Sequence, residues 1–271
     1  MRREGFLAYG ARQMTECVCA LEACLSALAP DDLRAVEDAL AAAHRLQTCL
    51  TLFAKGYPSP RVSLWKRRLR RIVRALNALR DCLRLAEWVA AQQPPPECVA
   101  GVRRALLRLH QRAETLHQTL RQAHQRWRDD HIPNEIKGLS RRWIQSFGDE
   151  AVDADYALQV WRRVQREQLA ALESPASSLA VQWGRVRALL EACDLLAPLG
   201  LPLECPDDLR ARSDALDAQR FRDEAHRLLR ELLQGERERA LQYAGNLRGF
   251  GRLQKGWQWL MEHIGLDIIP S

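Results

Sequence analysis

Apolar side chains recur every three or four residues along almost the whole chain, and this spacing restricts the fold more than any other feature. It is clearest in residues 62–92, where the apolar positions follow at intervals of 3, 1, 3, 3 and 4: Leu69, Ile72, Val73, Leu76, Leu79 and Leu83. This interval places the side chains on one face of an α-helix. No segment shows the sustained alternation of apolar and polar residues that is typical of a strand. The sequence therefore predicts an all-α fold.

Breaks in the pattern divide the chain into a series of helices. We expect helices over about residues 4–28, 33–53, 62–92, 97–130, 150–172, 178–197, 208–234 (one helix or two short ones) and 257–264. Segments with Pro, Gly or Ser separate them, at 55–60, 94–96, 133–138, 174–178, 198–206 and 245–256. Because the connections are short, we expect neighbouring helices to pack in antiparallel fashion.

Charge is concentrated in one third of the chain. The formal net charge is +7, but residues 61–142 hold 19 basic and 7 acidic residues and so carry +12. Residues 1–60 carry −1 and residues 143–271 carry −4. Of the 41 cations, 37 are Arg, whose planar guanidinium suits phosphate oxygens. This asymmetry indicates a localised anion-binding face.

A basic stripe on the helix of residues 62–92 is the clearest functional signal. It consists of Lys66, Arg67, Arg70, Arg71 and Arg74, opposite the apolar face and without an interleaved acid. A row of cations at successive turns neutralises several phosphates of a polyanion and releases their counterions. A solvated surface is the alternative interpretation. Cations on later helices would extend the stripe: Arg103, Arg104, Arg108, Arg112, Arg141 and Arg142.

Other polar residues are better explained by structure than by chemistry. We predict that Arg80 and Asp81 form an ion pair that fixes helix packing, since Asp is a poor helix former. Histidines recur every seven residues, at His110, His117, His124 and His131. Residues seven apart lie about 10.5 Å apart along a helix axis, too far for one metal ion to bridge. We expect these histidines to flank the packed seam, with a pH-sensitive anion surface as the alternative.

No catalytic motif is present in the sequence. We find no Gly-rich phosphate loop, no HExxH, no GxSxG and no paired-carboxylate signature. We therefore expect no enzymatic activity, cofactor or metal. The eight cysteines include no CxxC pair and lie mostly among apolar residues, so we expect buried free thiols.

The location that we expect is the cytoplasm. No apolar run approaches the roughly 20 residues that cross a bilayer. The first 17 residues are too polar for a secretory signal.

The order of the helices and the segment LWKRRLRRIVRALNALRDCLRL (residues 64–85) resemble the CHAD family, the conserved histidine α-helical domain. Members have two four-helix halves with approximate two-fold pseudo-symmetry around a basic channel, and they bind inorganic polyphosphate. The resemblance implies one domain over residues 5–265, with halves at about 5–132 and 149–265. It also implies a location at polyphosphate granules and inorganic polyphosphate or another polyanion as the partner.

The resemblance extends the anion-binding set to the signature helices of both halves. The first is VEDALAAAHRLQTCLTLF, which contributes His44 and Arg45, and the second is LAVQWGRVRALLEACDLL, which contributes Arg187. The name-giving histidines are absent: Glu37 and Ala180 stand in their places. Leu40 and Trp183 replace the arginines that follow them.

Two alternatives stay open because of these replacements. A diverged member that has lost the anion would act as a scaffold for a protein partner. The same basic stripe would also suit nucleic acid, although we consider this less favoured. We expect no membrane partner.

Overall fold

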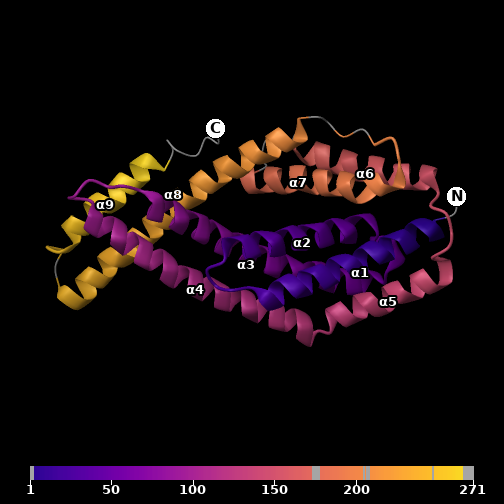
Figure 1. Cartoon of the computed structure of the whole chain (residues 1–271), viewed down its shortest axis with the longest axis horizontal. Coiled ribbons are helices and arrows are strands. Elements are labelled where there is room, and N and C mark those ends of the chain that lie inside the picture. The colour runs from indigo at the N-terminus through magenta and orange to yellow at the C-terminus, as the bar shows by residue number, and fades with distance from the viewer. Residues whose placement is uncertain (1–2, 173–177, 204, 206–207, 246, 265–271) are drawn as a thin grey trace. The chain divides into compact units, whose positions relative to one another are not determined.

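The computed structural model describes residues 3–172, 178–203, 205, 208–245 and 247–264, and this part of the chain is all-α (Figure 1). Its helices are α1 (Glu4–Ala27), α2 (Leu33–Leu52), α3 (Ser59–Ala91), α4 (Val99–Asp129), α5 (Ile132–Phe147), α6 (Ala154–Leu172), α7 (Leu179–Leu196), α8 (Leu209–Ala244) and α9 (Phe250–His263). Two 3₁₀ turns, η1 (Ala54–Gly56) and η2 (Ala197–Leu199), follow α2 and α7. Among the described helices, none has both the length and the hydropathy that a membrane span requires.

The expected helices are found, with three differences. Helix α5 occupies the region expected to be a break, because Pro133 lies in its first turn, where a missing N–H costs nothing. The change of direction between α4 and α5 occurs at His131, which has a φ of 54°. Helix α8 is continuous and runs ten residues beyond the expected end at 234, and α9 begins at Phe250 rather than at 257. The loop expected at 174–178 lies outside the described residues except for Ser178, which caps α7.

The chain forms two compact units. Unit 1 comprises residues 1–29, 34–76 and 119–217, and unit 2 comprises residues 30–33, 77–118 and 218–271. The long helices α3, α4 and α8 contribute residues to both units. The two-fold relation between sequence halves stays a prediction.

Aromatic side chains fill the core of unit 1. Trp65, Trp127 and Trp161 are almost completely buried, as are Phe6 and Phe53, whose ring centroids lie 5.0 Å apart. Burying a side chain of this size contributes roughly 1.5–3 kcal/mol. Helix α1 packs against α5, and α6 packs against α7 (Figure 1).

Unit 2 is held by a close approach of α4 and α9. A Cβ added to Gly101 would lie 2.2 Å from the carbonyl oxygen of Leu253 and 2.8 Å from the Cα of Gly256. Only glycine permits this backbone contact. Trp257 and Leu260 of α9 are completely buried.

The cysteines differ in part from the expectation. Cys193 and Cys205 form a disulfide, so the prediction of free thiols is wrong for this pair. Gly200, with a φ of 63°, turns the chain after η2 and returns Cys205 to the end of α7, with Cα atoms 6.8 Å apart. Free thiols are found at Cys17, Cys49, Cys82 and Cys98, which are buried, and also at Cys19 and Cys24, which are not.

Candidate anion-binding site

Unit 1 contains a cavity of about 720 Å³ whose walls come from α2, α3, α6 and α7. Its lining mixes cations with hydroxyl, amide and small apolar side chains: His44, Gln47, Thr48, Thr51, Lys66, Arg70, Val164, Gln168, Ala180, Val181, Gly184, Arg185, Arg187, Ala188 and Glu191. The size is that of a small-molecule site. The composition points to an anionic ligand that also accepts hydrogen bonds from neutral groups.

Helix α3 supplies Lys66 and Arg70, two cations of the predicted stripe. They are four residues apart and so lie on the same side of the helix. The Nε of Arg70 donates to the carbonyl oxygen of Lys66 at 3.1 Å, which holds the guanidinium along the helix. Burial, and then the charge of Arg70, lower the pKa of Lys66. An anion between the two would relieve this repulsion.

Helix α7 supplies Arg185 and Arg187. Arg187 was predicted, whereas Arg185 was missed. The Nη1 of Arg185 donates to Oε1 of Gln168 on α6 at 2.9 Å. The guanidinium of Arg187 lies 5.6 Å from the ring centroid of Trp183, and its Nη2 lies 3.8 Å from Oε1 of Glu191. Both arginines are therefore oriented by neutral or acidic neighbours in unit 1.

Helix α2 contributes a histidine and hydroxyl groups. The ring of His44 meets that of Trp183 edge to face, with centroids 5.5 Å apart. Thr48 and Thr51 also line the cavity. The hydroxyl of Thr51 donates to the carbonyl oxygen of Gln47 at 3.0 Å, whereas that of Thr48 can donate to a phosphate oxygen. The predicted position of His44 thus coincides with the cavity.

Arg45, by contrast, is not among the lining residues. Its Nη2 donates to Oε1 of Gln13 at 3.5 Å. It also adjoins the thiols of Cys17 and Cys49, whose Sγ atoms are 3.7 Å apart. The hydrogen bond from Cys49 lowers the pKa of Cys17, burial opposes this, and Arg45 lowers the pKa further. Arg45 therefore acts on the cavity only through its charge.

The stripe divides into two groups. Arg67 and Arg71 are exposed and lie outside the cavity lining, as does Arg74, whose Nε donates to the carbonyl oxygen of Arg70 at 3.4 Å. The basic residues of α3 also have an acidic neighbour, since the Nε of Arg68 lies 2.5 Å from Oδ2 of Asp130. We therefore separate the cavity cations from an outer row of Arg67, Arg71 and Arg74.

The proposed extension of the stripe does not reach the cavity. Arg104 and Arg108 belong to unit 2, where both pair with the buried carboxylate of Glu236, together with Arg239. Burial would raise the pKa of Glu236, but hydrogen bonds from Arg108, Arg104 and Arg239 outweigh it and lower the pKa. The other cations of the extension are not among the lining residues: Arg103, Arg112, Arg141 and Arg142.

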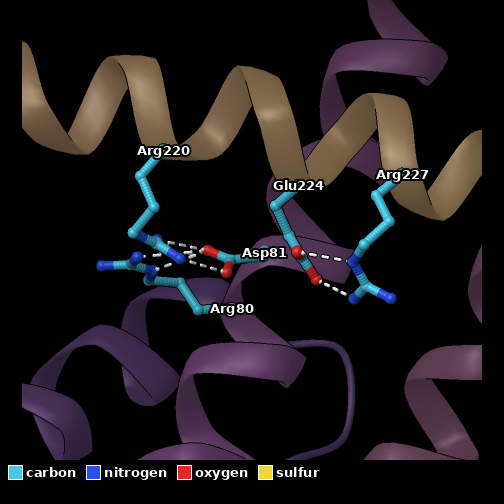
Figure 2. Close-up of polar contacts among 5 residues, drawn as sticks. All are labelled: Arg80, Asp81, Arg220, Glu224 and Arg227. Atoms are coloured by element: carbon cyan, nitrogen blue, oxygen red, sulfur yellow. Dashed lines mark hydrogen bonds and ion pairs between the residues drawn. The ribbon is translucent and has the colours of Figure 1, made fainter. Parts of the chain in front are cut away.

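The predicted ion pair of Arg80 and Asp81 is confirmed, and it has a third member in unit 2. The Nη2 of Arg80 lies 3.1 Å from Oδ1 of Asp81. Arg220 of α8 donates to both oxygens of Asp81, at 2.7 and 2.8 Å. Figure 2 shows both guanidinium groups facing the one carboxylate. This cluster joins α3 to α8 within unit 2.

The regular histidines have different surroundings. His124 lies 3.1 Å from Oε1 of Glu22, which also accepts from Nε1 of Trp127 at 3.0 Å. His117 is buried, whereas His110 is exposed and His131 lies beyond the end of α4. In the described part of the chain, no group of three or more His, Cys, Asp or Glu side chains could hold a metal ion.

A scan against protein-family models matches residues 12–163, more than half of the 271, to the CHAD domain. The chain belongs to the CHAD family. Searches of curated proteins and of solved structures found no match. The family match includes α2 and α3, whereas α7, which carries Arg185 and Arg187, lies beyond it. Two of the four Lys and Arg side chains among the described lining residues thus come from a helix outside the matched range.

Proposed function

We propose that this CHAD protein binds inorganic polyphosphate or a similar polyanion in the cavity of unit 1, without enzymatic turnover. One observation carries the proposal: α3 and α7 place four cations around one cavity. The charged lining residues among the described ones are Lys66, Arg70, Arg185, Arg187 and Glu191, which gives a formal charge of +3 with His44 neutral.

The chemistry suits a linear phosphate polymer better than a single small anion. Each internal phosphate carries about one negative charge, and neutralising it releases condensed counterions. Guanidinium groups bind phosphate oxygens in a bidentate manner, and the hydroxyl of Thr48 adds a neutral donor. We expect little selectivity for chain length beyond the phosphates that enter the cavity.

The test is a calorimetric titration of polyphosphate of defined length at two salt concentrations. We compare the wild type with three variants that each remove two cations: Lys66→Ala/Arg70→Ala, Arg185→Ala/Arg187→Ala and the control Arg67→Ala/Arg71→Ala. Each cavity variant should weaken binding by at least about 10- to 100-fold, which is the effect of losing one hydrogen bond to a charged group at roughly 1.5–3 kcal/mol. It should also reduce the slope of log K against log salt by about two, one for each cation. Equal losses in the control and the cavity variants would contradict the assignment to the cavity.

Nucleic-acid binding is a second candidate, and the outer row of Arg67, Arg71 and Arg74 favours it because all three are exposed on one helix. On this hypothesis duplex DNA should bind, and Arg67→Ala/Arg71→Ala should lose more affinity for DNA than either cavity variant does. If polyphosphate does not bind at either salt concentration, the proposal fails and a scaffold for a protein partner becomes the better hypothesis.

A further inference from the structure

Glu191 brings a carboxyl group into a site proposed to bind polyanions. It lies on α7 and is the one carboxylate among the described lining residues of the cavity. Its Oε1 is 3.8 Å from Nη2 of Arg187, and its side chain is only 16% exposed. An ionised carboxylate here would repel a phosphate and would also compete for the guanidinium of Arg187.

Glu191 shares the cavity with cations from α3 and α7. The charged and titratable groups are Arg185, Arg187 and Asp194 on α7, His44, Arg45 and Cys49 on α2, Lys66 and Arg70 on α3, and Cys17 on α1, while α6 presents the neutral Gln168. Asp194 is half exposed and forms a separate ion pair with Arg210, whose Nη2 lies 3.8 Å from Oδ1 of Asp194. Among the neighbouring charges, that of Arg187 lowers the pKa of Glu191 most, and its Nη2 lies 3.8 Å from Oε1 of Glu191.

The pKa of Glu191 is raised, mainly by burial. The charges of Arg187 and Arg45 oppose this increase, whereas that of Asp194 adds to it. An anion that enters the cavity neutralises the cations and adds negative charge beside the carboxylate. Both effects favour the protonated form. The carboxyl therefore gains affinity for a proton when the cavity fills.

We propose that Glu191 couples anion binding to the uptake of one proton from solvent. In the empty cavity the ionised carboxylate faces Arg187. When the anion enters, one carboxylate oxygen takes the proton, Arg187 turns to the phosphate oxygens, and the new O–H donates to the ligand. The inference rests on the proposed function, because it concerns the control of the same site.

His44 is a rival source of the same pH dependence. A protonated imidazole in the cavity would attract the anion, so affinity would again rise as pH falls. The two residues are distinguished by replacing each with a neutral amide of similar size, Glu191→Gln or His44→Gln. The terminal phosphates of the ligand also titrate, but they do so equally in every variant.

The experiment measures polyphosphate affinity from about pH 4 to about pH 8, which begins near the ordinary carboxyl pKa and extends above it. Calorimetry in two buffers of different ionisation enthalpy gives the number of protons taken up. The wild type should bind more tightly as pH falls, by up to tenfold per unit for one coupled proton. Glu191→Gln should lose this dependence and bind about tenfold more tightly than the wild type near pH 8.

The variants separate the outcomes. His44→Gln should keep most of the proton uptake, and Glu191→Asp, which restores a carboxyl group, should recover it. If Glu191→Gln binds polyphosphate with the proton uptake of the wild type, the coupling is refuted while the proposed function stands. If the wild type binds no polyphosphate at any pH, the proposed function fails and the coupling fails with it.

Discussion

Replacing Asp81 with Asn should strongly destabilise the protein. Asp81 and Arg80 are each 5% exposed and Arg220 is 12% exposed, and the single carboxylate accepts hydrogen bonds from both arginines (Figure 2). Asn has nearly the same shape, so the packing of α3 and α8 in unit 2 is kept. The change removes only the negative charge and leaves two buried guanidinium groups facing a neutral amide.

The expected loss is large for one substitution. Removing one partner of a buried ion pair costs about 3–5 kcal/mol, because the remaining charge is uncompensated. A typical free energy of unfolding is about 5–15 kcal/mol. At roughly 2–4 °C per kcal/mol for a chain of this size, the midpoint of thermal unfolding should fall by about 6–20 °C.

Urea unfolding followed by circular dichroism and calorimetry would measure this loss. The matched control is Glu224→Gln, which also removes a carboxylate from an ion pair in unit 2. Its partner Arg227 is 55% exposed, so the control should cost less than about 1 kcal/mol. Adding Arg220→Met to Asp81→Asn should recover part of the stability, because it removes one of the two guanidinium charges that had faced the carboxylate of Asp81. The reasoning is refuted if Asp81→Asn and the control differ by less than 1 kcal/mol.

Two further predictions concern unit 1. Reducing the disulfide, or changing Cys193 and Cys205 to Ser, should lower the free energy of unfolding by about 3 kcal/mol, because the two cysteines are 12 residues apart in sequence. Denaturant midpoints with and without reductant measure this loss. The midpoint of the double variant should not respond to reductant. Burial would raise the pKa of Glu22, but His124, Arg128 and Trp127 outweigh it and lower the pKa. The resulting stability is present above the ordinary carboxyl pKa and is lost as pH falls through the lowered value, so acid unfolding should be less steep in Glu22→Gln.

Periodicity predicted most of the fold because each helix buries one apolar stripe. It placed the ends of α3 and α4 within three residues of those observed. It failed at α5, where Pro133 was taken as a break although proline is favoured in the first turn of a helix. The hydrophobic residues Ile132 and Ile136, four apart and completely buried, were the signal that could have identified this helix.

The candidate site was predicted only in part, because it depends on which helices meet. Charge density identified Lys66 and Arg70, but it gave no reason to separate them from the neighbouring Arg67 and Arg71. Arg185 lies in an acidic part of the chain, 94 residues after the end of α3 at Ala91. No local pattern shows that α7 faces α3 across a cavity. That relation arises from tertiary packing, and so do the roles of Gln168 and Glu191.

Two residues that depart from the CHAD signature, Ala180 and Trp183, lie at or next to the cavity lining. In the helix that resembles the second signature helix, we expect Ala180 at the place of the family's histidine, and Ala180 lines the cavity. The same resemblance places Trp183 where the family has an arginine, which implies one cation fewer there. The indole, however, contacts the guanidinium of Arg187 and the ring of His44, and it therefore restricts both groups. A site with fewer cations that are better oriented loses less entropy when it binds. On this reasoning Trp183→Leu should weaken polyphosphate binding while leaving the salt dependence unchanged, whereas loss of a cation should change both.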